Sequence, residues 1–278
     1  MGFPCPKRQR RAGLTESSGN PVAHARGSLI HPAPTLPRMC TVTVIPTPAG
    51  PRLVHSRDEQ RTRAPAIAPA WRDLPSGRRA VWPTDPDAGG TWIAARDDGA
   101  VLGILNYNIP PNGRPEPVHS RGMVIPALID AGDAARAMER LADRDLVATA
   151  PFRLVAVDPD GHALLAAWDG LTLAPIEVLR PPFCLASSGL GDDRVRPRLP
   201  LFERLVVPDP TPKVQDAYHR HRWDERPEIS VLMSRRDART VSITTVEPDP
   251  AAAPSIRVET LPESDPAHDP VGAQLARS

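Results

Sequence analysis

The chain has 278 residues, of which 40% are apolar and only 4% aromatic, so it can form one large domain or two small ones around an aliphatic core. Its formal net charge of +1 argues against bulk electrostatic binding to nucleic acid, and no apolar run approaches the roughly 18 residues that span a bilayer. The three cysteines, Cys5, Cys40 and Cys184, match neither a disulfide framework nor a metal site and indicate a reducing, cytoplasmic compartment.

Residues 1–38 differ in composition from the rest of the chain. Their basic cluster, which includes Lys7, Arg8 and Arg10, stands against the single acid Glu16, and prolines interrupt any periodic pattern. No apolar segment of signal-peptide length follows this cluster. A transit peptide is one alternative, but we expect a disordered extension translated from a mis-assigned start.

Three hairpins are predicted in the first two thirds of the chain, because strand-like runs flank short turns rich in Asp, Gly and Pro. Residues 60–88, which follow the first hairpin, are polar and proline-bearing and are predicted to form a long surface excursion. The predicted strand pairs are 41–47 with 52–58, 91–96 with 101–106, and the two halves of 152–170 around Asp160-Gly161.

Helical patterns lie between the hairpins rather than after every strand. Residues 119–143 are predicted to be helical, with Asp133 as the N-cap of a second helix. Short helices are expected within 194–207 and 211–223. A final hairpin is predicted between Ile229–Met233 and Thr240–Val246, and the Pro-, Ala- and Asp-rich tail 248–278 is expected to be mobile.

This arrangement favours an α+β fold with antiparallel sheets over a doubly wound parallel fold. Two antiparallel sheets stacked face to face, with the helices outside, would bury the aliphatic runs. The predicted organisation is therefore an extension over 1–38, one domain over 39–247 and a tail over 248–278.

Cys40 stands at the junction between the basic leader and the first strand, directly after Met39. A buried cysteine at the start of a strand is common, and packing is the simplest interpretation. If Met39 were removed, however, the freed α-amino group (pKa ~8) could exchange a proton with the thiol (pKa ~8.5) and serve as its base. Both interpretations stay open from the residues alone.

Charged and amide side chains close to Cys40 in the predicted hairpin give two further candidates. The hairpin places Arg57 and Asp58 beside Cys40, where an arginine would lower the thiol pKa and a carboxylate would orient the α-ammonium, unless they form a solvated charge cluster. Asn106 ends an apolar strand and either donates to an oxyanion or caps the next loop. His219 and His221 are two residues apart on a predicted helix, so no metal site is expected there.

Several short motifs occur together in one order. They are Met39-Cys40, Ser56-Arg57-Asp58-Glu59, Arg63, Gly89-Gly90-Thr91-Trp92, Asn106-Tyr107, Ser120-Arg121-Gly122 and, more weakly, the run from Leu185 through Ser187 and Ser188. In this combination the chain, from Met39 to about residue 247, resembles the NRDE family, whose eukaryotic members are called transport and Golgi organisation protein 2. The resemblance implies that Met39 is the native start.

The family is similar to the N-terminal nucleophile hydrolases, which implies an αββα sandwich and hydrolysis of a non-peptide C–N amide bond without a cofactor. The resemblance implies that Cys40 is the nucleophile, that Arg57 and Asp58 or Glu59 are partners of the thiol and α-amine, and that Asn106 helps to form the oxyanion hole. Tyr107 and Ser188 are expected to give support. The implied partner is a small-molecule amide substrate.

Two positions depart from the family pattern. Ser56 stands where the family motif has Asn, and the segment with Ser187 lacks an Asn that usually supports the site, so a hydroxyl with one donor would have to substitute. These departures leave a second hypothesis, a non-catalytic binding or trafficking protein that handles haem or a lipid. Cys40 or His55 would then be candidate haem ligands.

Overall fold

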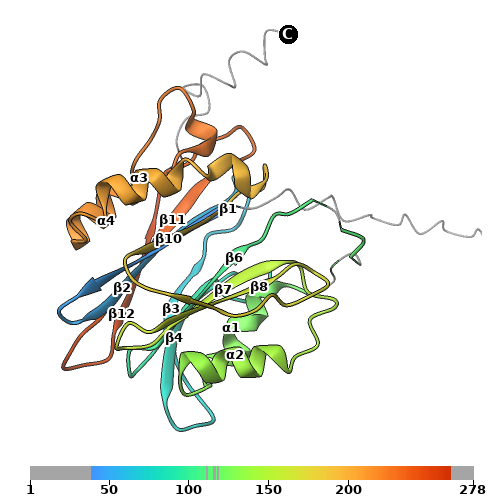
Figure 1. Ribbon diagram of the computed structural model, residues 1–278, viewed down its shortest axis with the longest axis vertical. Coiled ribbons are helices and arrows are strands. Elements are labelled where there is room, and N and C mark those ends of the chain that lie inside the picture. Colours follow the sequence, from blue (N-terminus) through green and yellow to red (C-terminus); the bar gives the residue numbers. More distant parts are fainter. Residues whose placement is uncertain (1–38, 111, 115–116, 118, 264–278) are drawn as a thin grey trace, which may run out of the picture. The chain divides into compact units, whose positions relative to one another are not determined.

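The computed structural model describes residues 39–110, 112–114, 117 and 119–263. The expected extension over 1–38 and the end of the expected tail, 264–278, lie outside these residues. The strands described here form two antiparallel sheets (Figure 1). One sheet has the order β10-β1-β2-β11-β12, and the other runs from β3 to β9 in chain order.

The five strands of the first sheet are β1 (Met39–Thr47), β2 (Gly50–Gln60), β10 (Phe183–Ser187), β11 (Ala238–Glu247) and β12 (Ser255–Thr260). The seven strands of the second are β3 (Ile67–Asp73), β4 (Arg79–Thr84), β5 (Ile93–Arg96), β6 (Val101–Asn106), β7 (Phe152–Val157), β8 (Ala163–Trp168) and β9 (Glu177–Leu179).

Helices cover the outer faces of both sheets. In Figure 1, α3 (Arg198–Leu205) and α4 (Pro212–His219) lie over the first sheet, where they contact β10, β1 and β2. The second sheet carries α1 (Val124–Leu128) against β5 and β6, and α2 (Ala134–Ala142) against β7 and β8. Because β1 contacts β6 between the sheets, the layers follow the order helix, sheet, sheet, helix. The predicted αββα sandwich is confirmed.

The first predicted hairpin is confirmed by the pairing of β1 with β2. Its turn needs Gly50, whose φ of 123° lies in a region that side chains with a Cβ rarely adopt. The Thr47 hydroxyl donates to the Gly50 carbonyl over 2.7 Å and closes the turn. This turn fixes the register in which Cys40 faces Arg57 at the other end of the hairpin.

Most of the other predicted elements are also confirmed. The hairpins β5–β6 and β7–β8 have the predicted partners. The side chain of Asp133 accepts a hydrogen bond from the Arg136 N–H over 2.7 Å, so it caps α2 as predicted. The remaining helical segments of the described residues are 3-10 helices at Arg121–Met123, Asp192–Val195 and Pro227–Ile229.

Three predictions from the sequence are wrong. Residues 60–88 contain β3 and β4 rather than a surface excursion, because β3 is an exposed edge strand whose polar and proline residues hide its pattern. The run from Ile229 to Met233 is not a strand; it is buried beneath α3, where Arg198 donates to the carbonyls of Ile229 and Ser230. β11 instead pairs with β2 and β12. The third wrong prediction is the mobile tail from 248, because Ser255–Thr260 returns to the sheet as β12.

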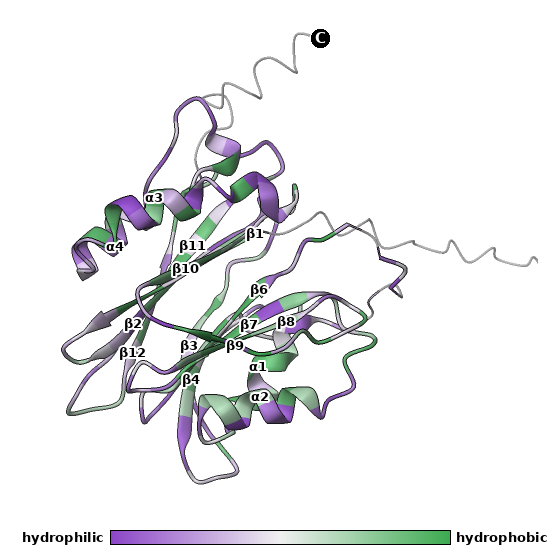
Figure 2. Ribbon diagram, in the orientation of Figure 1, coloured by the Kyte–Doolittle hydropathy of each residue, from purple (hydrophilic) through white to green (hydrophobic). Residues whose placement is uncertain are grey.

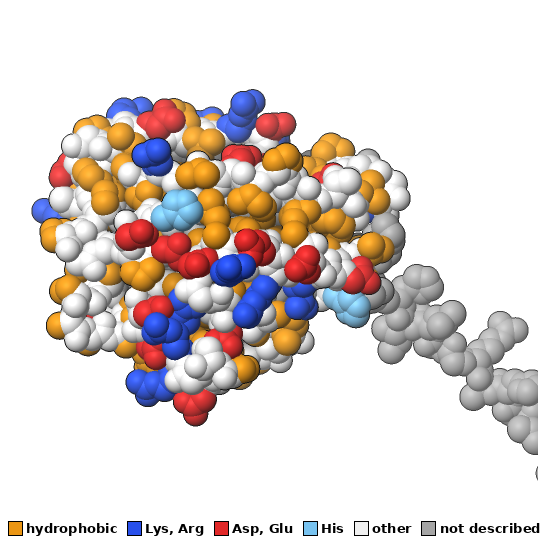
Figure 3. Space-filling view, turned by 60° about the horizontal axis from the view of Figure 1, so that its bottom comes forward, with side chains coloured by type: hydrophobic (Ala, Val, Ile, Leu, Met, Phe, Trp, Pro, Cys, Tyr) orange, Lys and Arg blue, Asp and Glu red, His pale blue; other side chains and the backbone are white. Residues whose placement is uncertain are grey.

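The core is aliphatic, as the composition predicts. Val42, Val44, Ile93 and Leu154 are fully buried, and the hydrophobic colouring in Figure 2 follows the central strands. Each such side chain contributes about 1.5–3 kcal/mol through burial. On the face in Figure 3, basic and acidic side chains lie side by side, which agrees with a net charge of +1. None of the helices described here is long and apolar enough to span a membrane.

Candidate active site

Cys40 lies on β1, which is the central one of three neighbouring strands, β10, β1 and β2. Its register partner on β2 is Arg57, and its partner on β10 is Ser187. Residues paired across antiparallel strands project from the same face of the sheet. The predicted proximity of Cys40 to Arg57 is therefore confirmed, and Ser187 joins them from a segment far along the chain.

A pocket opens between the two sheets at Cys40. Cys40 is 8% exposed and Asn106, at the end of β6, is 5% exposed. The Asn106 Nδ2 is buried and has no hydrogen-bond partner, although an amide nitrogen carries two donors. The other lining residues are Arg57, Asp58, Glu59, Asp85, Ala88, Thr91, Trp92, Ile104, Ser120, Arg121 and Gly122.

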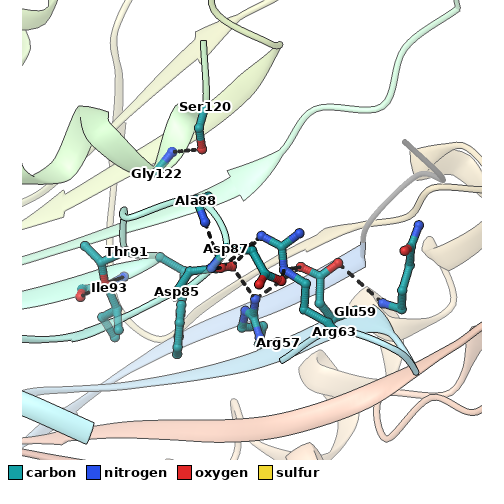
Figure 4. A network of polar contacts seen from close by, with 12 residues as sticks. Arg57, Glu59, Arg63, Asp85, Asp87, Ala88, Thr91, Ile93, Ser120 and Gly122 are labelled. Carbon is teal, nitrogen blue, oxygen red and sulfur yellow. Dashed lines mark hydrogen bonds and ion pairs between the residues drawn. The ribbon is translucent and has the colours of Figure 1, made fainter. Parts of the chain in front are cut away.

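Arg57 is held in the pocket wall by two carboxylates and one aromatic ring. Its Nη2 donates to Asp85 Oδ2 over 2.6 Å and to Glu59 Oε2 over 3.2 Å, as Figure 4 shows. Its guanidinium carbon lies 4.7 Å from the centre of the Trp92 ring. These contacts fix the orientation of the guanidinium and leave it available as a local positive charge beside Cys40.

Asp85 also belongs to this wall, although it is not among the residues predicted from the sequence. Its carboxylate accepts from Arg57, from Arg63 over 2.8 Å and 2.9 Å, and from the backbone N–H groups of Asp87 and Ala88. Partial burial opposes ionisation, but the hydrogen bond from Arg63 and the two guanidinium charges outweigh it and lower the Asp85 pKa. An Asp before a Gly-Gly turn was the available signal, since Asp side chains often close such turns.

The motifs that contain Gly90 and Gly122 form another part of the pocket rim. Thr91 N–H donates to the Gly122 carbonyl over 3.0 Å, which brings the two backbones into contact. A Cβ at Gly90 would overlap the carbonyl group of Gly122. The motifs around Gly90 and Gly122 therefore serve one close backbone contact rather than a phosphate loop.

Ser56 and Asp58 lie on the other face of β2 because successive side chains of a strand alternate. The Asp58 carboxylate accepts from the Thr240 hydroxyl over 2.5 Å and lies 3.6 Å from Arg198 Nη1. The Ser56 hydroxyl contacts His219 Nδ1 over 2.7 Å. The structure thus brings Arg57 and Glu59 together with Cys40 in the pocket but directs the side chains of Ser56 and Asp58 toward α3 and α4.

The Cys40 thiol is strongly held in its protonated form. Burial is the main reason that its pKa rises to about 12, and the charges of Asp58 and Glu59 raise it further. The Asp58 backbone N–H, which donates to the sulfur, and Arg57 act in the opposite direction. With residues attached before Cys40, the thiol is therefore a poor nucleophile at neutral pH.

The remaining predicted supporting residues lie along the same end of the sheets. Ser187 is fully buried, and its hydroxyl has no hydrogen-bond partner. Ser188 is also buried, and its N–H donates to Asp192 over 2.9 Å. Tyr107 lies under the Arg153 guanidinium, 4.6 Å from ring centre to guanidinium carbon.

His219, the last residue of α4, and His221, two residues beyond it, are engaged in other contacts. His219 is bonded at both ring nitrogens, to Ser56 and to Thr43, and burial lowers its pKa well below the usual value. His221 stacks edge-on against Trp223. Within the described residues, no three His, Cys, Asp or Glu side chains are grouped so that they could hold a metal ion.

Comparisons with known proteins identify both the fold and the family. The chain is similar to a solved N-acylethanolamine-hydrolyzing acid amidase orthologue of Caenorhabditis elegans, with a TM-score of 0.51 and 13% identity over 80% of this chain and 100% of that one. It also matches two variants of a conjugated bile acid hydrolase from Clostridium perfringens. The variant with a cysteine replaced by alanine has a TM-score of 0.47 and 12% identity, and the variant with an arginine replaced by leucine has 0.46 and 11%; each match covers 83% of this chain and 94% of the other.

Among curated proteins, no sequence matches this chain. Residues 41–197, however, match the family model described as Transport and Golgi organisation 2. This match covers more than half of the chain and includes the whole pocket wall from Arg57 to Gly122. The chain belongs to the Transport and Golgi organisation 2 family.

Proposed function

We propose that this protein is a cysteine hydrolase that cleaves a non-peptide amide bond after Cys40 becomes the first residue of the chain. One observation carries the proposal. Cys40 and the unpartnered Nδ2 of Asn106 line the same pocket, so an acyl group that reached the sulfur would find an amide donor with free hydrogen-bonding capacity.

Release of the residues before Cys40 would supply the base that the thiol lacks. A free α-amine has a pKa near ~8, so part of it is neutral at physiological pH and can accept the thiol proton. The resulting ammonium also lowers the thiol pKa through its charge. We therefore infer that the high thiol pKa of the longer chain keeps the nucleophile inactive until Cys40 is exposed.

The reaction would proceed in two stages. The Cys40 sulfur forms a bond to the amide carbonyl carbon while its proton moves to the α-amine, and Asn106 Nδ2 donates to the oxyanion. Collapse of the intermediate breaks the C–N bond, and the α-ammonium returns the proton to the departing amine. Water then attacks the thioester, which releases the carboxylic acid and restores the thiol.

The neighbouring residues would have distinct parts in this reaction. Arg57, aligned by Asp85 and Glu59, favours the thiolate through its charge. Ser187 offers a hydroxyl from the strand on the other side of Cys40, and Ser188 and Tyr107 keep that end of the site in place. The carboxylate of Asp58 acts from behind the sheet, through its charge, while its backbone N–H contacts the sulfur.

The experiment that tests this proposal compares amide hydrolysis by three proteins that begin at residue 40: wild type, Cys40→Ala and Asn106→Ala. A panel of N-acyl amides with varied acyl chains would be followed by release of the amine. We expect Cys40→Ala to abolish turnover and Asn106→Ala to lower kcat by about 10²–10³-fold. Full turnover by Cys40→Ala would refute the mechanism.

A second candidate is a non-catalytic binding or trafficking protein for haem or a lipid. The buried, protonated Cys40 thiol of the longer chain agrees with a non-catalytic role, although it would have to lose its proton to ligate haem iron. His55, the other candidate haem ligand, is fully buried, although its Nδ1 has no partner. A haem titration followed by absorbance would give a saturable shift if this candidate is correct. The free thiols of Cys40 and Cys184 suit the cytoplasmic location that we propose for either function.

A further inference from the structure

An ion pair outside the pocket connects the two sheets at the end where Cys40 and Asn106 lie. Arg153, on β7 of the seven-stranded sheet, places its Nη2 2.7 Å from Asp192 Oδ2 at the start of the 3-10 helix that follows β10. Arg153 Nη1 also donates to the carbonyl of Ala186, on β10 itself, over 3.1 Å. A residue of one sheet thus contacts the end of an edge strand of the other.

The Asp192 carboxylate collects further donors from both sides. Its Oδ1 accepts the N–H of Ser188, the residue after Ser187, over 2.9 Å. It also accepts hydrogen bonds from the side chain and backbone of Asn108, two residues beyond Asn106. Arg153 in turn lies over the ring of Tyr107, the residue that follows Asn106. Each contact is therefore one or two residues from a group that borders the pocket or pairs with Cys40.

We propose that Asp192 and Arg153 form a clamp that holds the ends of β6 and β10 at a fixed separation across the pocket. Asp192 is then a positioning residue that acts through Asn106 and Ser187. The part of this inference that concerns catalysis rests on the proposed hydrolase function, whereas the part that concerns the closure of the pocket over Cys40 does not.

Partial burial makes this pair different from the surface pairs of the protein. The side chains of Arg153 and Asp192 are 20% and 16% exposed, while those of Arg136 and Glu139 on α2 are 68% and 61% exposed. An exposed pair is weakened by water and salt, but a carboxylate with several charge-assisted and backbone hydrogen bonds is not easily replaced by water. Loss of the Asp192 charge should therefore open this end of the pocket rather than leave it unchanged.

The test measures how fast iodoacetamide alkylates Cys40, with the site of modification read by peptide mass spectrometry. Because Cys40 is only 8% exposed at the wall of the pocket, a wider opening at this end should speed its alkylation. We expect Asp192→Asn to raise the rate by about tenfold, because a carboxylate that accepts several hydrogen bonds is lost. Asp193→Asn is the matched control, since the Asp193 side chain is 93% exposed.

A second control separates local opening from general destabilisation. Leu141→Ala removes a fully buried side chain of α2, away from the pocket, and lowers the melting temperature without touching the clamp. Asp192→Asn should accelerate alkylation more than Leu141→Ala at equal distance below each melting temperature. Arg153→Gln should reproduce the effect, and the two clamp variants together should give no more than one alone.

The outcomes distinguish this inference from the proposed function. Equal alkylation rates for wild type, Asp192→Asn and Asp193→Asn, or no excess over Leu141→Ala, would overturn the clamp. If wild type hydrolyses no amide but the alkylation result holds, only the hydrolase proposal fails. Where turnover is found, Asp192→Asn should lower kcat more than it changes KM, and should add little to the loss in Asn106→Ala; a full additive loss would overturn action through Asn106.

Discussion

The two faces of β2 carry the four consecutive residues Ser56 to Glu59 into different surroundings. On the face toward the second sheet, Arg57 and Glu59 border the pocket and share their charges with Asp85 and Arg63. On the face toward the helices, Asp58 and Ser56 are fully enclosed with Arg198 and His219. A continuous motif in the sequence thus serves two separate networks, one beside the candidate nucleophile and one that anchors α3 and α4.

The two faces should differ most in the free energy of unfolding that is lost when Arg198, on the helix side, or Arg57, on the pocket side, is replaced. Arg198→Met leaves the Asp58 carboxylate buried without its nearest guanidinium, and we expect a loss of about 3–5 kcal/mol in the free energy of unfolding. Arg57→Met should cost less, about 1–3 kcal/mol, because Arg63 still binds Asp85. Urea denaturation of both variants measures the difference, and equal losses would contradict this account of the two networks.

The buried histidines predict how the stability of the fold depends on pH. Burial lowers the pKa of His55 from 6.5 to about 4 and lowers that of His219 well below its usual value. The unfolded chain therefore binds more protons below pH 6.5, and the folded state should lose stability as the pH falls from 6.5 toward 4. For His55 alone the loss is about 3 kcal/mol over this window.

Chemical denaturation at a series of pH values checks this dependence. His55→Gln keeps a donor for the Ile104 carbonyl but cannot be protonated, so its stability should fall less steeply between pH 6.5 and 4 than that of wild type. Identical slopes for the two proteins would show that His55 does not contribute to the acid sensitivity.

The glycine contact at the pocket rim should tolerate no side chain at Gly90. Gly90→Ala places a Cβ against the Gly122 carbonyl, and we expect a loss of about 1–3 kcal/mol in the free energy of unfolding. At Gly89 there is open space but a φ of 68°, so Gly89→Ala should cost about 1–2 kcal/mol through backbone strain alone. Thermal melts of the pair, with ligand-binding or activity assays, would show whether only Gly90→Ala also alters the pocket.

The smallest expected effect is a change in the pKa of the Cys40 thiol, which responds to charges on both faces of β2. The negative charge of Asp58 raises the thiol pKa from behind the sheet, so Asp58→Asn should lower it. Arg57→Met should raise it, because the positive charge on the pocket side is lost. The pH dependence of Cys40 alkylation reports both shifts, and a shift of the same sign in both variants would contradict the opposed roles of the two charges.

The elements that could be predicted from the sequence are those with strong local signals. The β1–β2 and β7–β8 hairpins combine β-branched or aliphatic runs with turn residues, and Asp133 is a recognisable N-cap. β3 and β12 were missed because exposed edge strands need not show an alternating pattern of buried side chains. The run from Ile229 to Met233 has the apolar pattern of a strand because its burial beneath α3 produces the same signal.

The contacts of the candidate site can likewise be divided into those that local sequence predicts and those that depend on the packing of distant segments. Proximity of Cys40 to Arg57 follows from the hairpin register, which short-range reasoning can supply. The faces occupied by Asp58 and Ser56 also follow from the alternation of side chains along β2. Asp85, Ser187 and Asp192 reach the site only when distant strands are packed together, so their contacts could not be predicted from spacing.

The most direct measurement of the central claim is a search for an acyl group on Cys40. Two proteins would be compared by intact mass after mixing with the same activated amide or ester: one that begins at Cys40, and one that retains a single glycine before Cys40. The account predicts a thioester on Cys40, sensitive to hydroxylamine, that forms rapidly only in the first protein. Equal acylation of both proteins, or none in either, would contradict a nucleophile that depends on its own α-amine.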